Sequence, residues 1–293
     1  MSIIVVFGKN GQVGYELTRT LSTMGDIIAI DIEECDLTRP ESILRFLNEN
    51  KPRMIVNSAA YTAVDKAESE PEIAHKINSI APSVMAEWAK SNDAILVHYS
   101  TDYVFDGTKN SPWTEDDSPN PLNVYGKTKL AGDDAIQKSG CEYLIFRTSW
   151  VYGARGKNFY LTMRKLLSEK EEIKVVNDQI GAPTWSRAIA EATAQVLVQV
   201  FSPASTLKIY SGIYNMTNSG STSWFGFTEA IRNNMIIENP QQLNLARVIP
   251  IPGTEYPTPA KRPQYSCLNC NKLFNTFGIK LSEWSVDLHK LYF

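Results

Sequence analysis

A tyrosine and a lysine four residues apart could carry out proton transfer. Tyr125 and Lys129 stand in the run Tyr-Gly-Lys-Thr-Lys. On a helix, this spacing places two side chains on one face, about 5–6 Å apart. An ammonium so near favours the phenolate of a tyrosine, whose ordinary pKa is about 10, and so lowers that pKa. The pair predicts a general acid and base, although an amphipathic helix could carry the same two residues by coincidence.

A hydroxyl group that could polarise the same substrate carbonyl follows an apolar segment. Residues 95–99 are typical of a buried strand, and Ser-Thr-Asp-Tyr comes next, with Thr101 and Asp102 at its centre. Open α/β folds bind ligands at the carboxyl ends of their strands. Thr101, Tyr125 and Lys129 are therefore the candidate catalytic residues.

The run Gly-Lys-Asn-Gly-Gln-Val-Gly at residues 8–14 predicts a dinucleotide site. It follows an apolar segment and opens a helical pattern. Glycines at 8 and 11 let the backbone approach a pyrophosphate, the glycine at 14 lets helix and sheet pack closely, and the helix N-terminus favours an anion. Asp31, at the end of the next strand, would bind the adenosine ribose and disfavour a 2′-phosphate, whereas Lys9 could pair with that phosphate. NADH and NADPH both stay open.

A third apolar segment, residues 54–58, precedes Ala59, Ala60, Tyr61, Thr62 and Val64. The small residues let the backbone lie close to the adenosine and ribose of the cofactor. Thr62 and Val64 are expected to point toward the nicotinamide and the substrate.

Short apolar runs that alternate with helical patterns must position these residues. The apolar runs are at 3–7, 27–31, 54–58 and 95–100, and residues 72–91 form an amphipathic pattern through Ile73, Ile77, Ile80, Val84 and Trp88. The predicted fold is α/β, a Rossmann-like doubly wound parallel sheet with a smaller C-terminal substrate-binding region. We expect a dinucleotide-binding domain over 1–150, a mainly substrate-binding region over 151–293, and a returning segment near 213–235.

Composition limits the partners. The 293 residues are 43% hydrophobic and carry a net charge of -3, so no large cationic field is available for nucleic acid or an anionic bilayer. No stretch reaches the roughly 18 apolar residues of a membrane span. Four irregularly spaced cysteines, the last two at Cys267 and Cys270, favour a reducing cytoplasm, and a lone Cys-x-x-Cys with scattered histidines does not make a zinc site. We expect a small-molecule or protein partner and no metal.

The glycine loop followed by the hydroxyl, the tyrosine and the lysine resembles the pattern of the extended short-chain dehydrogenases/reductases. Within that group, five motifs are similar to those of the dTDP-4-dehydrorhamnose reductase family. They are Gly-Lys-x-Gly-Gln-Val-Gly, Ala-x-Tyr-Thr-Ala-Val-Asp-Lys-Ala-Glu, His-Tyr-Ser-Thr-Asp-Tyr-Val-Phe, Asn-Val-Tyr-Gly-x-Thr-Lys and Arg-Thr-Ser-Trp-Val-Tyr. The resemblance implies reduction of the 4-keto group of dTDP-4-dehydro-β-L-rhamnose by NADPH or NADH, and a homodimer.

The resemblance also implies site residues. The catalytic residues would be Thr101, Tyr125 and Lys129, and the sugar would meet Thr101, Asp102, Tyr125 and Trp150, which join Thr62 and Val64 as the predicted substrate contacts. With the loop and small residues above, the predicted cofactor contacts are Gly8, Asn10, Gly11, Gln12, Val13, Gly14, Asp31, Asp36, Leu37, Ala59, Ala60, Tyr61, Thr62, Tyr99 and Lys129. Arg155, Lys157, Lys261 and Arg262 are candidates for the substrate diphosphate or for solvated surface charges.

The sequence departs from the family pattern at a predicted dimer contact and is compatible with other functions. Some relatives bridge a dimer contact through Mg²⁺ held by acidic residues. Glu16 matches one such position, but Arg187 stands where another carboxylate is expected. The hypothesis is therefore a direct Glu16–Arg187 pair between subunits, and Mg²⁺ is not expected. Another nucleotide-sugar 4-ketoreductase or an epimerase would share these motifs. A dehydratase is disfavoured because Tyr103, not glutamate, follows Asp102. A non-catalytic regulatory subunit resembling the β subunit of methionine adenosyltransferase gives no chemical reason for keeping the three catalytic residues together.

Overall fold

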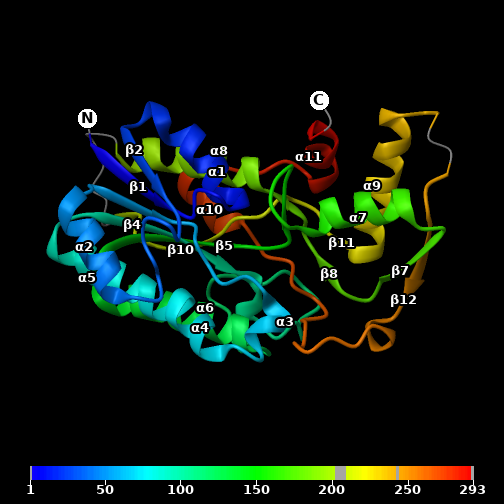
Figure 1. The fold of residues 1–293 in the computed structure, drawn as a ribbon, viewed down its shortest axis with the longest axis horizontal. Helices are drawn as coiled ribbons and strands as arrows, with labels where there is room; N and C mark the ends of the chain where they lie inside the picture. Colours follow the sequence, from blue (N-terminus) through cyan, green and yellow to red (C-terminus); the bar gives the residue numbers. More distant parts are fainter. Residues whose placement is uncertain (1, 202–208, 242–243, 292–293) are drawn as a thin grey trace.

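A parallel sheet organises most of the chain in the computed structural model, which describes residues 2–201, 209–241 and 244–291. Within these residues the sheet has six strands in the order β10-β5-β4-β3-β1-β2, and all neighbouring strands are parallel (Figure 1). They are β1 (Ile3–Phe7), β2 (Asp26–Ile30), β3 (Met54–Asn57), β4 (Ile95–Thr101), β5 (Glu142–Thr148) and β10 (Gly212–Asn215). The predicted Rossmann-like α/β fold is confirmed, and β10 lies where the returning segment begins.

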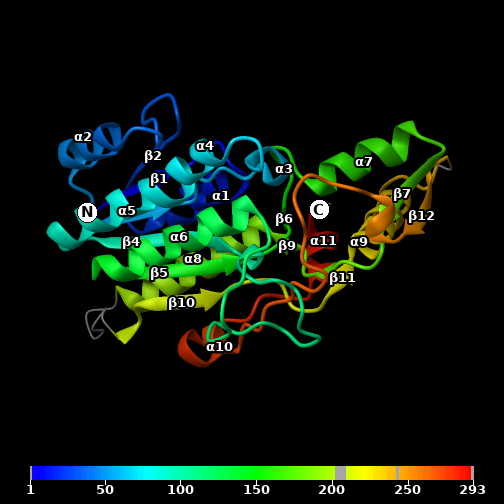
Figure 2. The ribbon, with the colours of Figure 1, turned by 90° about the horizontal axis from the view of Figure 1, so that it is seen from below.

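Helices cover both faces of this sheet, which explains why its strands are continuously apolar. On one face lie α1 (Gln12–Thr20) with η1 (Leu21–Thr23), α8 (Ser186–Val200) and α10 (Asn271–Phe277); on the other lie α2 (Pro40–Asn50), α5 (Ala81–Ser91) and α6 (Val124–Ser139) (Figures 1 and 2). Successive strand residues alternate between the two cores: Val6 and Val56 join the first, whereas Val5 and Ile55 join the second. Because α8 and α10 follow residue 150, later parts of the chain also build this sheet's core.

The predicted helix over 72–91 is interrupted by a wider turn. It consists of α4 (Pro71–His75), the π-helical turn η2 (Lys76–Ile80) and α5, with the short α3 (Val64–Ala67) before it. The prediction that Ile73 lies on the buried face is wrong, because Ile73 is 41% exposed while Ala74 and Asn78 are buried. The face that carries Asn78 packs closely against α6. A Cβ on Gly132 of that helix would lie only 2.2 Å from the Asn78 carbonyl oxygen.

The remaining elements form a smaller lobe, to the right in Figure 1. Three helices, α7 (Phe159–Glu169), α9 (Trp224–Glu238) and α11 (Trp284–Lys290), contribute to its own hydrophobic core together with the parallel pair β7 (Glu172–Val176) and β12 (Arg247–Ile251). Two short pairs connect it to the sheet region: β6 (Val151–Tyr152) with β9 (Thr184–Trp185), and β8 (Ile180–Gly181) with β11 (Thr222–Ser223). Two 3₁₀ turns, η3 (Asp102–Val104) and η5 (Gly253–Glu255), complete the elements used below. No helix among the described residues has both the length and the apolar character needed to cross a membrane.

Gly14 offers a test of the close contact between α1 and β1. A Cβ there would lie 1.9 Å from the Gly8 carbonyl oxygen, so Gly14→Ala must push the helix away from the loop. We expect a loss of roughly 2–3 kcal/mol in the free energy of unfolding, measured by urea denaturation. Gly212→Ala is the control, because its nearest neighbour atom would be 3.8 Å away. Equal stability of the two variants would contradict the packing argument.

Candidate active site

Four strand ends bring the predicted site residues to one edge of the sheet. The loop at 8–14 follows β1, Asp31 follows β2, residues 58–60 follow β3, and Thr101 ends β4. Since the strands are parallel, their carboxyl ends share this edge, and the chain order changes direction at β1, which has β2 on one side and β3 on the other. Such a switch point is where open α/β sheets bind ligands.

A cavity of about 230 Å³ opens at this edge. Gly8 forms part of its wall with a φ of +86°, and a Cβ there would lie 2.9 Å from the Ala59 backbone nitrogen. Glycine is therefore required both by backbone conformation and by space. The predicted cofactor residues that line the cavity are Gly8, Asp31, Asp36, Leu37, Ala59 and Ala60. Apolar walls with a few carboxylates suit an adenosine.

Asp31 is held in place by backbone donors. The N–H of Asn10 donates to Asp31 Oδ2 (3.0 Å), and the N–H of Ile32 donates to Oδ1 (2.9 Å). Beside it, Lys9 forms an ion pair with Glu34, and this contact raises the lysine pKa. The cation that could have met a 2′-phosphate is thus already paired with a carboxylate.

Thr101 and Asp102 form a tight turn at the end of β4. The Thr101 hydroxyl accepts a hydrogen bond from the N–H of Tyr103 and lies 3.1 Å from Asp102 Oδ1, to which it donates. Both residues are buried. Burial raises the pKa of the Asp102 carboxyl to about 7, against the opposing effect of hydrogen bonds from the hydroxyls of Ser266 and Thr101.

Tyr125 lies in the first turn of α6. Asn123 caps this helix, because its Oδ1 accepts from the N–H of Gly126 (2.8 Å). The phenol ring packs edge-on against Tyr103, with ring centroids 5.8 Å apart. Loss of water contact raises the pKa of Tyr125 to about 12, although a hydrogen bond with Thr101 favours the phenolate. The structure therefore brings the tyrosine and threonine hydroxyls together, as one catalytic pair requires.

The expectation that Lys129 lowers the pKa of Tyr125 is wrong for this structure. Lys129 is 1% exposed, and its ammonium contacts the Tyr99 carbonyl oxygen (2.5 Å) and His98 Nε2 (3.0 Å). Desolvation of the phenol hydroxyl thus dominates at Tyr125. Burial lowers the pKa of Lys129 itself to about 8, with the nearby Asp133 carboxylate acting in the opposite direction.

Asn78 is a positioning residue that the sequence reasoning missed. Its amide exchanges two hydrogen bonds with the backbone of Tyr61, at 2.8 and 3.1 Å, and also donates to Thr128 of α6. It thereby ties the segment after β3 to the helix that carries Tyr125 and Lys129. A polar residue at a buried position of the apolar helix over 72–91 was the available signal.

Two predicted contacts occupy distinctive positions. The side chain of Tyr99 is buried against α8, where its hydroxyl meets Thr193 (2.8 Å), so that only its carbonyl faces Lys129. Trp150 has a φ of +46° and stacks on Trp224 with ring centroids 3.4 Å apart. Strained backbone of this kind persists where surrounding packing holds it, and here it places an indole between the two lobes.

The charged candidates for a diphosphate differ in their surroundings. Arg262 binds Asp65 through both guanidinium nitrogens, at 2.8 and 3.1 Å. Arg155 lies over the Tyr15 ring of α1, 3.8 Å from the ring centroid, on the side of the glycine loop. Lys157 and Lys261 are exposed.

Glu16 and Arg187 already form an ion pair within one chain, and the hypothesis of such a pair between subunits stays a prediction. Arg187 Nε lies 3.3 Å from Glu16 Oε2, joining α8 to α1, and these two helices pack on the same face of the sheet. The four cysteines are free thiols, and the described residues contain no group of three or more metal-ligating side chains.

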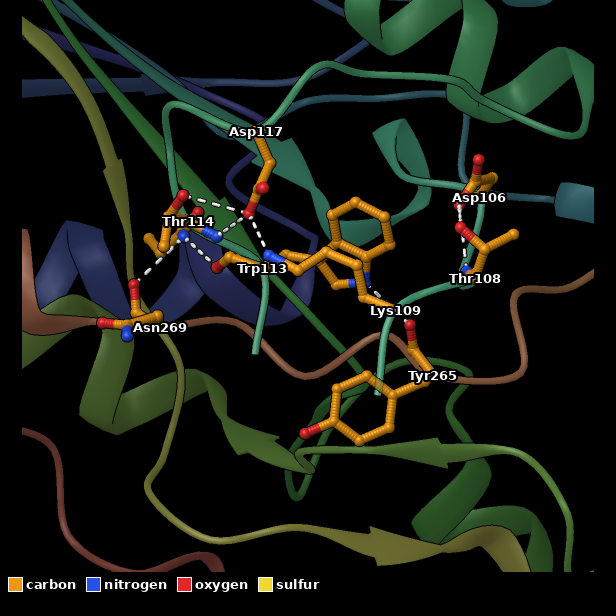
Figure 3. A network of polar contacts seen from close by, with 9 residues as sticks. Asp106, Thr108, Lys109, Trp113, Thr114, Asp117, Tyr265 and Asn269 are labelled. Carbon is orange, nitrogen blue, oxygen red and sulfur yellow. Dashed lines mark hydrogen bonds and ion pairs between the residues drawn. The ribbon is translucent and has the colours of Figure 1, made fainter. Parts of the chain in front are cut away.

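A long loop after η3 joins the catalytic strand to the C-terminal segment. Figure 3 shows Asp117 receiving hydrogen bonds from Lys109 and Thr114 within this loop. Trp113 anchors the loop, because its Nε1 donates to the Tyr265 carbonyl and its backbone oxygen accepts from Asn269. The loop after Asp102 and the segment around 265–269 are therefore held together by hydrogen bonds.

The fold and the site define a Rossmann-fold protein of the short-chain dehydrogenase/reductase class. More narrowly, the chain belongs to the family described as the RmlD substrate binding domain, whose model matches residues 1–292. It is 46% identical to a dTDP-4-dehydrorhamnose reductase of Burkholderia thailandensis over 96% of this chain and 95% of that protein, and 42% identical to the one of Escherichia coli K12 over 98% and 96%.

Solved structures agree. A dTDP-4-dehydrorhamnose reductase from Bacillus anthracis, in complex with NADP, has a TM-score of 0.90 at 33% identity and covers 99% of this chain and 98% of its own. A UDP-glucose 4-epimerase from Thermus thermophilus shares the fold, with a TM-score of 0.78 at 17% identity, 99% of this chain and 98% of its own.

Asp102 predicts a pH-dependent stability. The pKa of its carboxyl is higher in the folded state (about 7) than the ordinary value of 3.8, so the folded protein favours the protonated form. The stability that this form contributes is fully present below about pH 4 and is lost as the pH rises through 7. The free energy of unfolding of Asp102→Asn, relative to wild type, should rise by roughly 2–4 kcal/mol as the pH goes from 4 to 7, and should not rise further at higher pH. Urea denaturation across this range measures the difference. The exposed Asp116→Asn should show no such trend; a flat difference for Asp102→Asn would refute the assignment.

Proposed function

We propose that the chain catalyses the NADPH- or NADH-dependent reduction of the 4-keto group of dTDP-4-dehydro-β-L-rhamnose to give dTDP-β-L-rhamnose. The observation that carries the proposal is the convergence of Thr101, Tyr125 and Lys129 at the edge that also holds the glycine loop. The two curated relatives and the NADP-bound structural relative support the substrate and cofactor.

The chain's own residues account for the proton side of this reaction. Bound NAD(P)H would supply a hydride to the carbonyl carbon. Tyr125, whose high pKa keeps it protonated, donates its proton to the developing alkoxide. The Thr101 hydroxyl lies beside Tyr125, and by turning its hydrogen from Asp102 Oδ1 to the same substrate oxygen it can lower the cost of the negative charge. Lys129 lies one helical turn from Tyr125 with its ammonium on the Tyr99 carbonyl and His98, and its proposed role is to hold the nicotinamide ribose of the cofactor.

The cofactor contacts proposed from the residues fit the cavity beside β1. Asp31 accepts backbone hydrogen bonds and can also accept from a ribose hydroxyl, while Gly8 and Ala59 leave room for backbone approach. The homodimer and the cytoplasmic location expected from the sequence stay predictions.

Tyr125→Phe tests the assignment of the proton donor. Removing only the hydroxyl should lower kcat by at least about a hundredfold and leave NAD(P)H affinity within a few fold, because the ring still packs on Tyr103. The assay is NAD(P)H absorbance loss with enzymatically prepared dTDP-4-dehydro-β-L-rhamnose. Tyr143→Phe, on β5 away from the site, is the matched control.

The outcomes separate the alternatives. Wild-type activity in Tyr125→Phe would contradict the role of this residue. Cofactor binding without turnover in the wild-type protein would indicate that the substrate is another keto sugar nucleotide. Turnover of a sugar nucleotide without net loss of NAD(P)H would favour the epimerase alternative.

Glu34→Gln tests the electrostatics of cofactor choice. The substitution removes the carboxylate paired with Lys9 and frees that ammonium for a 2′-phosphate. We expect kcat/KM to rise about fivefold for NADPH relative to NADH, which corresponds to one charge interaction at the surface. Glu33→Gln makes the same change of net charge without freeing Lys9. An equal shift in both variants would show that net charge alone, not the Lys9 contact, decides the preference.

A further inference from the structure

We infer that His98, with Asn57 behind it, is a positioning residue that fixes the Lys129 ammonium at the carboxyl edge of the sheet. The inference rests on the proposed function for its consequence in catalysis, but the contacts themselves are independent of any substrate. His98 Nε2 lies 3.0 Å from Lys129 Nζ, and His98 Nδ1 lies 3.1 Å from Asn57 Nδ2. All three side chains are buried, with exposures of 0% for His98 and Asn57 and 1% for Lys129.

The number of hydrogens determines how this chain of contacts must be arranged. An ammonium only donates hydrogen bonds, and a neutral imidazole accepts at one nitrogen and donates at the other. Lys129 donates to the Tyr99 carbonyl, and its next neighbour is Nε2 of His98. Nε2 must therefore be the acceptor, and the ring hydrogen must be on Nδ1.

Asn57 can satisfy that hydrogen. Its amide offers an oxygen or, turned by half a rotation, a nitrogen toward the ring, and the two orientations have nearly the same shape. An Nδ1–H requires the oxygen. With its amide turned in this way, Asn57 accepts from Nδ1 and supports the tautomer in which Nε2 faces the lysine with its lone pair.

The charges around this group keep the histidine neutral. Burial and the neighbouring Lys129 both hold the pKa of His98 well below 6.5. The other charged groups buried nearby are Asp133 of α6 and Arg147 of β5, whose Oδ2 and Nε are 3.5 Å apart, and Ser100 donates to the same Asp133 oxygen (2.7 Å). Asp133 and Arg147 thus compensate each other, and His98 is left as a neutral acceptor for Lys129.

The consequence is a defined effect on pH dependence. An acceptor hydrogen-bonded to the ammonium favours its charged form, so loss of the acceptor lowers the pKa of Lys129 from about 8. Because the proposed role of Lys129 uses its ammonium, we expect His98→Leu to move the basic limb of the kcat profile at least about one pH unit lower. His98→Gln carries an amide oxygen that can accept from Lys129, and should restore most of the shift.

Matched controls come from His75, which is exposed on α4. His75→Leu and His75→Gln should keep the wild-type profile. Thermal denaturation and NAD(P)H binding of each His98 variant separate a lost fold from a lost contact. A folded His98→Leu with the wild-type basic limb would overturn the inference.

A second measurement needs no turnover. The chain has three histidines, so selective ¹⁵N labelling and a long-range ¹H–¹⁵N correlation resolve the His98 ring, assigned by its absence in His98→Gln. We expect an unprotonated Nε2 and a protonated Nδ1 at neutral pH. Hydrogen on Nε2 would overturn the inference even if the proposed reaction is observed. The expected tautomer without turnover of the keto sugar would instead refute only the proposed function.

Discussion

A positive charge buried beneath the carboxyl edge of the parallel sheet is the constraint around which the site is built. The ammonium of Lys129 has almost no contact with solvent, and an uncompensated charge in such a place would cost several kcal/mol. The Tyr99 carbonyl and His98 satisfy it directly, and Asp133 lies close enough to favour its charged form. His98 and Tyr99 belong to β4 and Asp133 belongs to α6, so the charge is stable only when the sheet and this helix are packed together.

Close approach of backbone segments is the second requirement. Gly126 and Gly132 both lie on α6, and a Cβ at either would come within 2.2 Å of a carbonyl oxygen, that of Tyr103 for the first and of Asn78 for the second. The helix that carries Tyr125 and Lys129 can therefore lie directly against the turn after Thr101 and against the π-helical turn. Glycines on α6 thus let the helix pack closely, and this packing determines where the proposed catalytic side chains of the same helix lie.

The smaller lobe is joined to this edge by contacts that are distant in sequence. Trp150 stacks on Trp224, and the loop around Trp113 holds the segment at 265–269. Asp65 receives a bidentate contact from Arg262. Residues predicted to face the sugar are thus held by contacts with both lobes.

The sequence by itself determined the parallel α/β fold and the main residues of the edge. Short apolar runs, the glycine loop and the Tyr-x-x-x-Lys spacing are local signals, because each depends on neighbouring residues and on the regular geometry of strands and helices. Tertiary structure decided the protonation behaviour of the pair. Four-residue spacing predicted a lowered tyrosine pKa, whereas burial raises it and directs Lys129 toward His98 and Tyr99.

Contacts between segments that are far apart in the sequence could not be predicted, because they too depend on which elements pack together. Asn78 and His98 are single polar residues within apolar patterns, and their partners come from other elements. The π-helical turn changed which face of residues 72–91 is buried and left Ile73 exposed. Local spacing specifies which residues can share a face, but desolvation and hydrogen-bond partners depend on what the folded chain packs against that face.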